Sequence, residues 1–137
     1  MTRSSTAHPP VLGILVGHGS LPGALLEAAS SIVGTSDGVV AVPTRGLSAA
    51  DMESRLSQVV GEHPECEILI LVDLHGSSCS NVSAKIQHHH PANVRVVTGV
   101  NLPMLIRFLY YRQRLRLAEL TELMRRTGQE EIRISPC

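Results

Sequence analysis

Four short apolar runs, each followed by a segment with helical spacing, limit the fold of this chain more than any other feature. The runs are VLGILVG (11–17), VVAVP (39–43), EILILVD (67–73) and VRVVTG (94–99). Nearly continuous apolar runs of this length predict strands that are buried on both faces. Right-handed crossovers place the connecting helices on both faces of a parallel sheet. The sequence therefore predicts an α/β fold of three layers, a sandwich in which a mostly parallel central sheet lies between two layers of helices.

Apolar side chains recur at helical spacing after each run, which predicts helical stretches over 21–32, 52–60, 81–88, 102–112 and 117–124, the last closed by Gly128. The C-terminal segment EEIRIS (130–135) alternates in polarity instead and predicts a final strand, antiparallel to the others. That strand is either an edge strand of the same chain or a strand supplied to a partner molecule.

Length and composition predict one domain over 11–137, after a disordered tail, MTRSSTAHPP, over 1–10. The chain has 137 residues, of which 43% are hydrophobic, enough for a single core. Twelve basic residues balance 12 acidic ones, so no net charge recruits nucleic acid or a membrane surface. No apolar run approaches the roughly 20 residues of a membrane span. The three cysteines are widely spaced and form no CxxC pair, and the N-terminus lacks the pattern of a signal peptide. Both features predict a reducing, cytoplasmic location.

One histidine has the position of a reactive group. His18 lies between two glycines where the first apolar run ends and a helical stretch begins. Ligands of open α/β sheets bind beyond the carboxyl ends of the strands, and a helix N-terminus favours an anion such as phosphate. Asp73 ends the third run, and in a strand order of 2-1-3-4 it would face His18. A carboxylate that accepts the proton of one imidazole nitrogen leaves the lone pair of the other free to attack.

A phosphoryl group on His18 would require hydrogen-bond donors around it. The candidates are Gly19 and Ser20 at the start of the first helix, and Ser78 and Asn81 after Asp73. The sequence therefore assigns His18 and Asp73 to catalysis and these four residues to positioning of the phosphate.

Three segments resemble the enzyme IIA domain of the mannose-type sugar phosphotransferase system (PTS). They are LVGHGSLPGALLEAASSIVG (15–34), LILVDLHGSSCSN (69–81) and VVTGVNLPMLIR (96–107). The family has the second segment close to LVDxxGGSPxN and the third close to GVNxPML. The three segments occur in the family's order and span most of residues 11–110.

The resemblance implies a phosphotransferase that needs no cofactor. His18 would accept a phosphoryl group from the carrier protein HPr and pass it to a IIB domain, with Asp73 orienting the histidine. The resemblance also implies an α/β sandwich that forms homodimers, in which the final strand, here EEIRIS, can be exchanged between subunits.

The loop after Asp73 departs from the family pattern. His75 replaces an apolar or aromatic residue, Ser77 replaces the second glycine and Cys79 replaces the proline. We assign these three residues to the rim that a partner would contact, with Cys79 as a small neutral filler. Arg107 lies where the family commonly has an acidic residue. The altered loop keeps one alternative open, a regulatory module on the same fold that binds a partner or a metal ion.

Several residues also have a simpler interpretation. Asp73 could cap the following helix through Ser77 or Ser78. His75 could take part in proton transfer or bind a metal. His88, His89 and His90 invite a metal interpretation, but their position before Pro91 favours interaction with the carbonyls of a helix C-terminus. The sequence therefore assigns no metal site.

Overall fold

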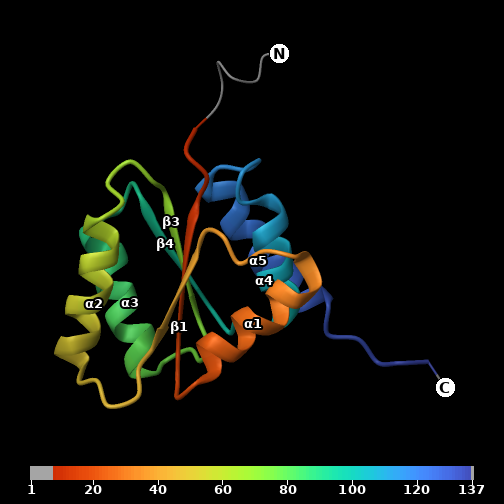
Figure 1. Cartoon of the computed structure of the whole chain (residues 1–137), viewed down its shortest axis with the longest axis horizontal. Helices are drawn as coiled ribbons and strands as arrows, with labels where there is room; N and C mark the ends of the chain where they lie inside the picture. Colours follow the sequence, from red (N-terminus) through yellow and green to blue (C-terminus); the bar gives the residue numbers. More distant parts are fainter. Residues whose placement is uncertain (1–7, 137) are drawn as a thin grey trace.

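A four-stranded parallel sheet in the order β2-β1-β3-β4 forms the middle layer of the computed structural model, which describes residues 8–136 (Figure 1). In chain order the elements are β1 (Leu12–Gly17), α1 (Leu21–Val33), β2 (Val39–Pro43), α2 (Ala49–Gly61), β3 (Ile68–Val72), α3 (Ser78–His89), β4 (Val94–Thr98), α4 (Leu102–Tyr111) and α5 (Leu117–Glu130). The predicted fold class, the parallel pairing and the 2-1-3-4 order are confirmed.

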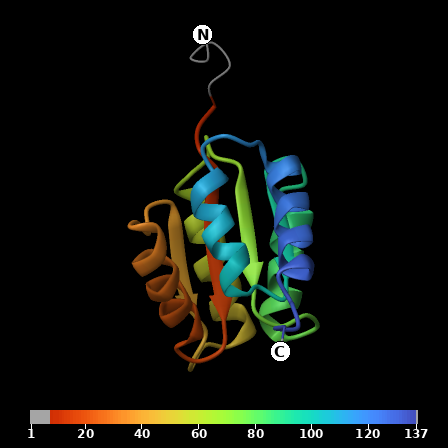
Figure 2. The same cartoon turned by 90° about the vertical axis from the view of Figure 1, so that its right-hand side faces the viewer.

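Helices cover both faces of the sheet. Figures 1 and 2 show α2 and α3 on one face, and α1, α4 and α5 on the other. Side chains on alternate positions of the central strands enter opposite cores: Ile14 and Ile70 pack with α2 and α3, whereas Leu15 and Leu71 pack with the other three helices. This two-sided burial explains why the strands are apolar at almost every position.

The register brings the carboxyl ends of three strands together. Val16 of β1 lies opposite Val42 of β2 and Val72 of β3. The segments that follow these residues therefore leave the sheet at the same edge and surround the end of β1. The candidate site lies at this edge.

Two helix boundaries differ from the sequence prediction. Helix α3 begins at Ser78 rather than at 81, because Ser77 has an extended backbone and its hydroxyl accepts a hydrogen bond from the Ser80 backbone N–H. Helix α5 continues through Gly128 to Glu130. Gly128 lies close to α4, since a Cβ atom at this position would lie 2.8 Å from the Met104 sulfur.

The predicted C-terminal strand does not form within the chain, so that part of the fold prediction is corrected. Helix α5 takes up Glu130, and the described residues after it, 131–136, have no regular secondary structure. In Figure 1 this segment extends away from the helices. Ile132 and Ile134 are 78% and 98% exposed. An alternating segment gains strand structure only by pairing with a sheet edge, and no strand of residues 8–136 pairs with this one.

The predicted disordered tail, 1–10, falls mostly on residues 1–7, which lie outside the described residues; the described remainder, 8–10, has no helix or strand. Within 8–136, the helices are too short or too polar to cross a membrane.

Candidate active site

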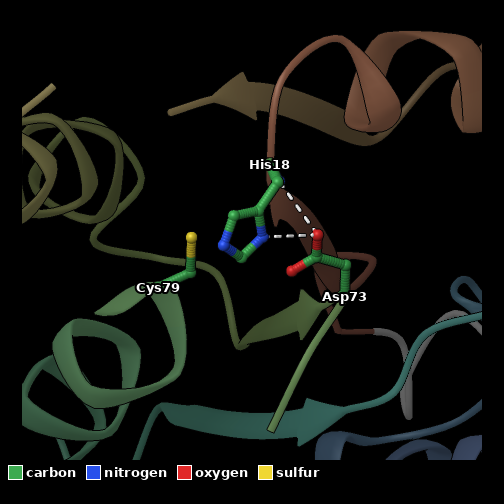
Figure 3. Close-up of side chains that lie close together, drawn as sticks. All are labelled: His18, Asp73 and Cys79. Atoms are coloured by element: carbon green, nitrogen blue, oxygen red, sulfur yellow. Dashed lines mark hydrogen bonds and ion pairs between the residues drawn. The ribbon is translucent and has the colours of Figure 1, made fainter. Parts of the chain in front are cut away.

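His18 and Asp73 lie beside each other at the carboxyl edge of the sheet, as their positions after two apolar runs predicted. His18 directly follows β1 and Asp73 directly follows β3, and the two are 55 positions apart in the chain. The Asp73 Oδ2 atom lies 2.9 Å from His18 Nδ1 and accepts a second hydrogen bond, also 2.9 Å long, from the His18 backbone N–H (Figure 3). The carboxylate therefore fixes both the backbone and the ring of the histidine.

Gly17 allows this approach, because a Cβ atom at its position would lie 2.9 Å from Asp73 Oδ2. Burial of the Asp73 carboxylate favours its neutral form, but the hydrogen bonds from the backbone and ring of His18, together with the charge of that ring, outweigh burial and lower the pKa of Asp73. Asp73 is therefore a stable anion beside an imidazole that is 57% exposed. Such a pair favours the proton on Nδ1 and the lone pair on Nε2.

Asp73 does not cap α3, so the simpler interpretation of this residue is wrong. Ser77 makes the cap, and its hydroxyl donates a further hydrogen bond to the Leu74 carbonyl. The second carboxylate oxygen of Asp73, Oδ1, is buried and has no hydrogen-bond partner within the described part of the chain. Buried acceptors of this kind are uncommon in proteins and usually bind ordered water or a ligand.

The loop between β3 and α3 divides into exposed and buried residues. His75 is exposed, as a rim residue should be, and its Nδ1 lies 3.1 Å from the Thr98 hydroxyl at the end of β4. Ser78 and Asn81 are exposed on the first turn of α3. Cys79 is only 2% exposed, so the prediction that it belongs to the rim is wrong. The earlier start of α3 turns its side chain inward, toward the sheet.

Thr44 and Arg45, which follow β2, were not identified from the sequence. The Thr44 hydroxyl donates to the Gly17 carbonyl at 3.0 Å and accepts a hydrogen bond from the Cys79 thiol at 3.7 Å. The Arg45 guanidinium lies 3.2 Å from the position that a Cβ of Gly19 would occupy. Their place directly after the second apolar run was the available signal, since strands β1 and β2 end at the same edge.

On the other side of His18, the chain turns into α1. Gly19 has a φ of +55°, in the left-handed region that favours glycine. Ser20 is the N-cap of α1, yet within residues 8–136 its hydroxyl accepts no capping hydrogen bond. Gly19, Ser20 and Arg45 also line a cavity of about 380 Å³ between α1 and β2. Hydroxyl, backbone and guanidinium donors thus lie beside the exposed imidazole.

The metal interpretation of the histidine tract finds no support in the geometry. His88 and His89 are the last residues of α3 and His90 is its C-cap, where the sequence placed them. The group of potential metal ligands that the described residues bring within 4.8 Å of one another is a different one, His18, Asp73 and Cys79.

Comparisons with known proteins identify the fold and the family. A family model described as "PTS system fructose IIA component" matches residues 13–124. The chain belongs to this family.

Relatives and solved structures agree with this assignment. The fructose-specific EIIA component of the PTS from Bacillus subtilis is 30% identical over 123 residues, which are 88% of this chain and 84% of that protein. The sorbose-specific EIIA component of Klebsiella pneumoniae is 32% identical over 70% of each chain. A crystal structure of an EIIA component from Streptococcus agalactiae superposes with a TM-score of 0.83 at 27% identity, covering 90% of this chain and 96% of that one.

Family membership makes this chain a phosphoryl-transfer component of a sugar phosphotransferase system, and it acts with the other components of that system. None of the comparisons favours a regulatory module without phosphoryl transfer. Among the loop residues singled out from the sequence, Cys79 has its sulfur within 4.8 Å of ligand atoms of His18 and Asp73.

Proposed function

We propose that His18 is the residue that carries the phosphoryl group. The observation that supports this most directly is the hydrogen bond of 2.9 Å between Asp73 Oδ2 and His18 Nδ1 at the carboxyl edge of the sheet. Because Nδ1 donates to an ionised carboxylate, the lone pair is held on Nε2. The ring is more than half exposed, so a donor protein can bring its phosphoryl group to that atom.

The transfer itself is an in-line displacement at phosphorus. The Nε2 lone pair forms the new N–P bond, and the bond between phosphorus and the donor breaks with its electron pair leaving on the donor. The proton on Nδ1 stays between His18 and Asp73, and the Asp73 anion stabilises the positive charge that develops on the ring. No other reactant is needed, and the reverse steps pass the group to an acceptor.

The surroundings of His18 suit an anion after transfer. The N-terminus of α1 and the free hydroxyl of its N-cap, Ser20, lie on one side, with the Arg45 guanidinium close to Gly19. The exposed first turn of α3, with Ser78 and Asn81, lies on the other side. Helix N-termini and charge-assisted donors favour a phosphoryl group of about −1.5 to −2 charge. We assign Gly19, Ser20, Arg45, Ser78 and Asn81 to this role.

Phosphorylated HPr is the donor in this proposal and a IIB domain is the acceptor, in the cytoplasm. We further infer a homodimer in which residues 131–136 pair with a sheet edge of the second subunit. Isoleucines exposed by 78% and 98% in that segment support the pairing, since an alternating apolar segment is stabilised by burial against a partner. Removal of 131–137 should then convert the dimer to a monomer in light scattering.

The test of His18 is labelling with phosphoenolpyruvate, enzyme I and HPr. Wild type should gain one acid-labile, base-stable phosphoryl group per chain, and His18→Ala should gain none. His63→Ala is the matched control, because His63 is also a partly exposed histidine with its Nδ1 hydrogen-bonded, at 2.9 Å from the Val59 carbonyl. Label that persists in His18→Ala, or wild type that takes up no label, would overturn the assignment.

A further inference from the structure

The peptide unit that joins Gly17 to His18 is hydrogen-bonded to the ends of both neighbouring strands. Its N–H group, that of His18, donates to Asp73 Oδ2 at 2.9 Å, just beyond β3. Its carbonyl, that of Gly17, accepts two hydrogen bonds from Thr44, just beyond β2. One comes from the Thr44 backbone N–H at 3.2 Å and the other from the Thr44 hydroxyl at 3.0 Å. The peptide is therefore held from both sides, and both lone pairs of its carbonyl oxygen are used.

The sequence around this peptide does little to fix it. His18 lies between Gly17 and Gly19, and neither glycine has a Cβ atom that would restrict the backbone. The imidazole ring is more than half exposed, so few packing contacts hold it. Hydrogen bonds therefore determine where the backbone of His18 lies and, with it, the direction in which Nε2 points.

The Thr44 hydroxyl adds a bond that strand pairing alone would not give. The Thr44 backbone N–H continues the pairing of β1 with β2 by one residue, which any residue except proline could do. The second bond to the Gly17 carbonyl needs a short side chain with a hydroxyl. Because a carbonyl only accepts, the hydroxyl donates to it, and the hydroxyl oxygen accepts from the Cys79 thiol at 3.7 Å.

These hydrogen bonds all point toward the Asp73 carboxylate. The Thr44 hydroxyl donates to the Gly17 carbonyl, and the N–H group of the same peptide donates to Asp73 Oδ2. Successive hydrogen bonds in such a chain polarise and strengthen one another. The chain ends on the same oxygen that accepts from His18 Nδ1 (Figure 3). Thr44 is thus connected to the reacting ring through one peptide and one carboxylate.

Thr44 is itself held in place. It begins a tight turn in which the Leu47 N–H donates to the Thr44 carbonyl at 3.0 Å. The turn leads into α2, whose N-cap, Ser48, forms a capping box. The neighbouring residue in the turn, Arg45, has its guanidinium close to Gly19. A side chain anchored in this way can hold the peptide of His18 without moving with it.

We propose that Thr44 is a positioning residue for phosphoryl transfer, which acts on His18 through the hydrogen bond from its hydroxyl to the Gly17 carbonyl. This inference rests on the proposed function and deepens it. The hydroxyl contributes to how precisely Nε2 is aimed at phosphorus, so its loss lowers the rate of the transfer step. It does not contribute to the surface that a donor protein contacts, so its loss leaves donor binding unchanged.

The transfer test compares Thr44→Val with wild type in single-turnover labelling from phosphorylated HPr. Valine has a similar shape and keeps the backbone N–H, so the change removes the hydroxyl alone. The maximal rate should fall about 3–10-fold, as expected for the loss of one hydrogen bond. The HPr concentration at half-maximal rate should change by less than about twofold. Thr44→Ser, which keeps a hydroxyl, should restore the maximal rate to within about twofold of wild type.

Thr121→Val is the matched control. Thr121 is also half-buried, and its hydroxyl also donates to a carbonyl, that of Leu117 at 2.7 Å, but it lies within α5. Its loss should leave the maximal rate unchanged. Circular dichroism verifies folding of each variant, and Thr44→Ala removes the same hydroxyl if the valine variant does not fold.

NMR of the unphosphorylated protein tests the hydrogen bond without any transfer. The His18 amide proton should move upfield in Thr44→Val, because the N–H bond to Asp73 weakens when the carbonyl of its peptide loses a donor. The signal should stay near its wild-type position in Thr44→Ser and in Thr121→Val. A purely structural role of Thr44 would lower stability without this pattern.

Three results would overturn the proposal. They are an unchanged maximal rate in Thr44→Val, a loss that Thr44→Ser does not restore, and a His18 amide signal that stays in place in Thr44→Val. Failure of the proposed function looks different, because wild type itself would then take up no label. In that case the amide signal still decides whether Thr44 holds the peptide of His18.

Discussion

The two ends of the sheet collect the same residue types and use them differently. At the carboxyl ends of the strands, His18, Asp73 and Cys79 bring their ligand atoms within 4.8 Å of one another. At the amino ends, His63, Cys66 and His90 line a cavity of about 180 Å³. Among the described residues, those at the carboxyl ends come together as one group, whereas those at the amino ends bond other parts of the chain.

The difference follows from where each side chain finds its partner. The His63 ring bonds the Val59 carbonyl in the last turn of α2, the helix that precedes it. Glu67 accepts hydrogen bonds from the Arg116 side chain and from the Leu117 backbone N–H, where it serves the start of α5. The polar groups at the amino ends are thus occupied by the backbone and by structural ion pairs. Those at the carboxyl ends are occupied by one another.

Strand polarity explains this contrast. The carboxyl end of a parallel strand leads into a helix N-terminus, whose N–H groups need acceptors and favour anions. The amino end of a strand follows a helix C-terminus, whose carbonyls attract donors such as histidine. Composition alone therefore does not identify a site in this chain. The direction of the strands next to each histidine does.

Exchange of the two carboxylates for amides should give the largest contrast. Asp73→Asn should slow phosphoryl transfer by about 10–100-fold, because a neutral amide holds His18 weakly and its N–H₂ group favours the tautomer with the proton on Nε2. Glu67→Gln, at the opposite end, should leave the rate unchanged. Initial rates of labelling from phosphorylated HPr measure both. Equal rates for Asp73→Asn and wild type would show that Asp73 has only a structural role.

The close approach of β1 to Asp73 should appear in stability. Gly17→Ala should lower the free energy of unfolding by about 1–3 kcal/mol, since the new Cβ would lie 2.9 Å from Asp73 Oδ2 and the short side chain has little freedom to move. Gly61→Ala, at the end of α2 with open space around its Cβ position, should leave stability unchanged or raise it by up to about 1 kcal/mol. Urea unfolding of both variants measures the difference, and a Gly17→Ala protein as stable as wild type would contradict the packing argument.

The sequence was sufficient to predict the sheet and the central pair. Strand order and polarity fix which residues leave the sheet at the same edge, so His18 and Asp73 could be paired from their positions after two apolar runs. The periodicity of the helices was equally informative. These features depend on patterns that repeat along many residues, which makes them robust to local detail.

Features that depend on one local choice were harder to predict. Three serines and a cysteine follow Gly76, and only the extended backbone of Ser77 decides that this serine caps α3 and that Cys79 is turned inward. Thr44 and Arg45 follow a strand but belong to no periodic pattern. The alternation of EEIRIS indicates a preference for strand structure but not whether a sheet edge is available to pair with it. In each case the missing information is a tertiary contact.

The pH dependence of stability should be similar for the carboxylates at the two ends of the sheet. The two ends should therefore differ in the chemistry of their side chains and not in how pH affects their stability. Burial is outweighed by hydrogen bonds at Asp73, and the Arg116 hydrogen bond outweighs burial at Glu67, so the pKa of each carboxyl is lowered in the folded chain. A lowered folded pKa gives stability that is present above the unfolded pKa, about 3.9 for Asp and 4.3 for Glu, and lost as pH falls through the folded pKa. The destabilisation caused by Asp73→Asn, about 1 kcal/mol near pH 7, should therefore shrink below about pH 4. A difference in stability between Asp73→Asn and wild type that stays constant down to acid unfolding would contradict this prediction.

The smallest effect concerns the thiol at the amino end. Burial raises the pKa of Cys66, and the neighbouring Glu65 carboxylate raises it further through its charge and a hydrogen bond from the thiol. Glu65→Gln should lower that pKa and speed alkylation of Cys66 by iodoacetamide near pH 8 about two- to fivefold, the effect of removing one exposed charge. Cys79 should stay largely unmodified in both proteins, because its side chain is 2% exposed. Mass spectrometry of the two peptides gives both rates in one experiment. If Cys79 reacted faster than Cys66, the burial of the Cys79 thiol at the carboxyl end would be wrong, and with it this difference between the two ends of the sheet.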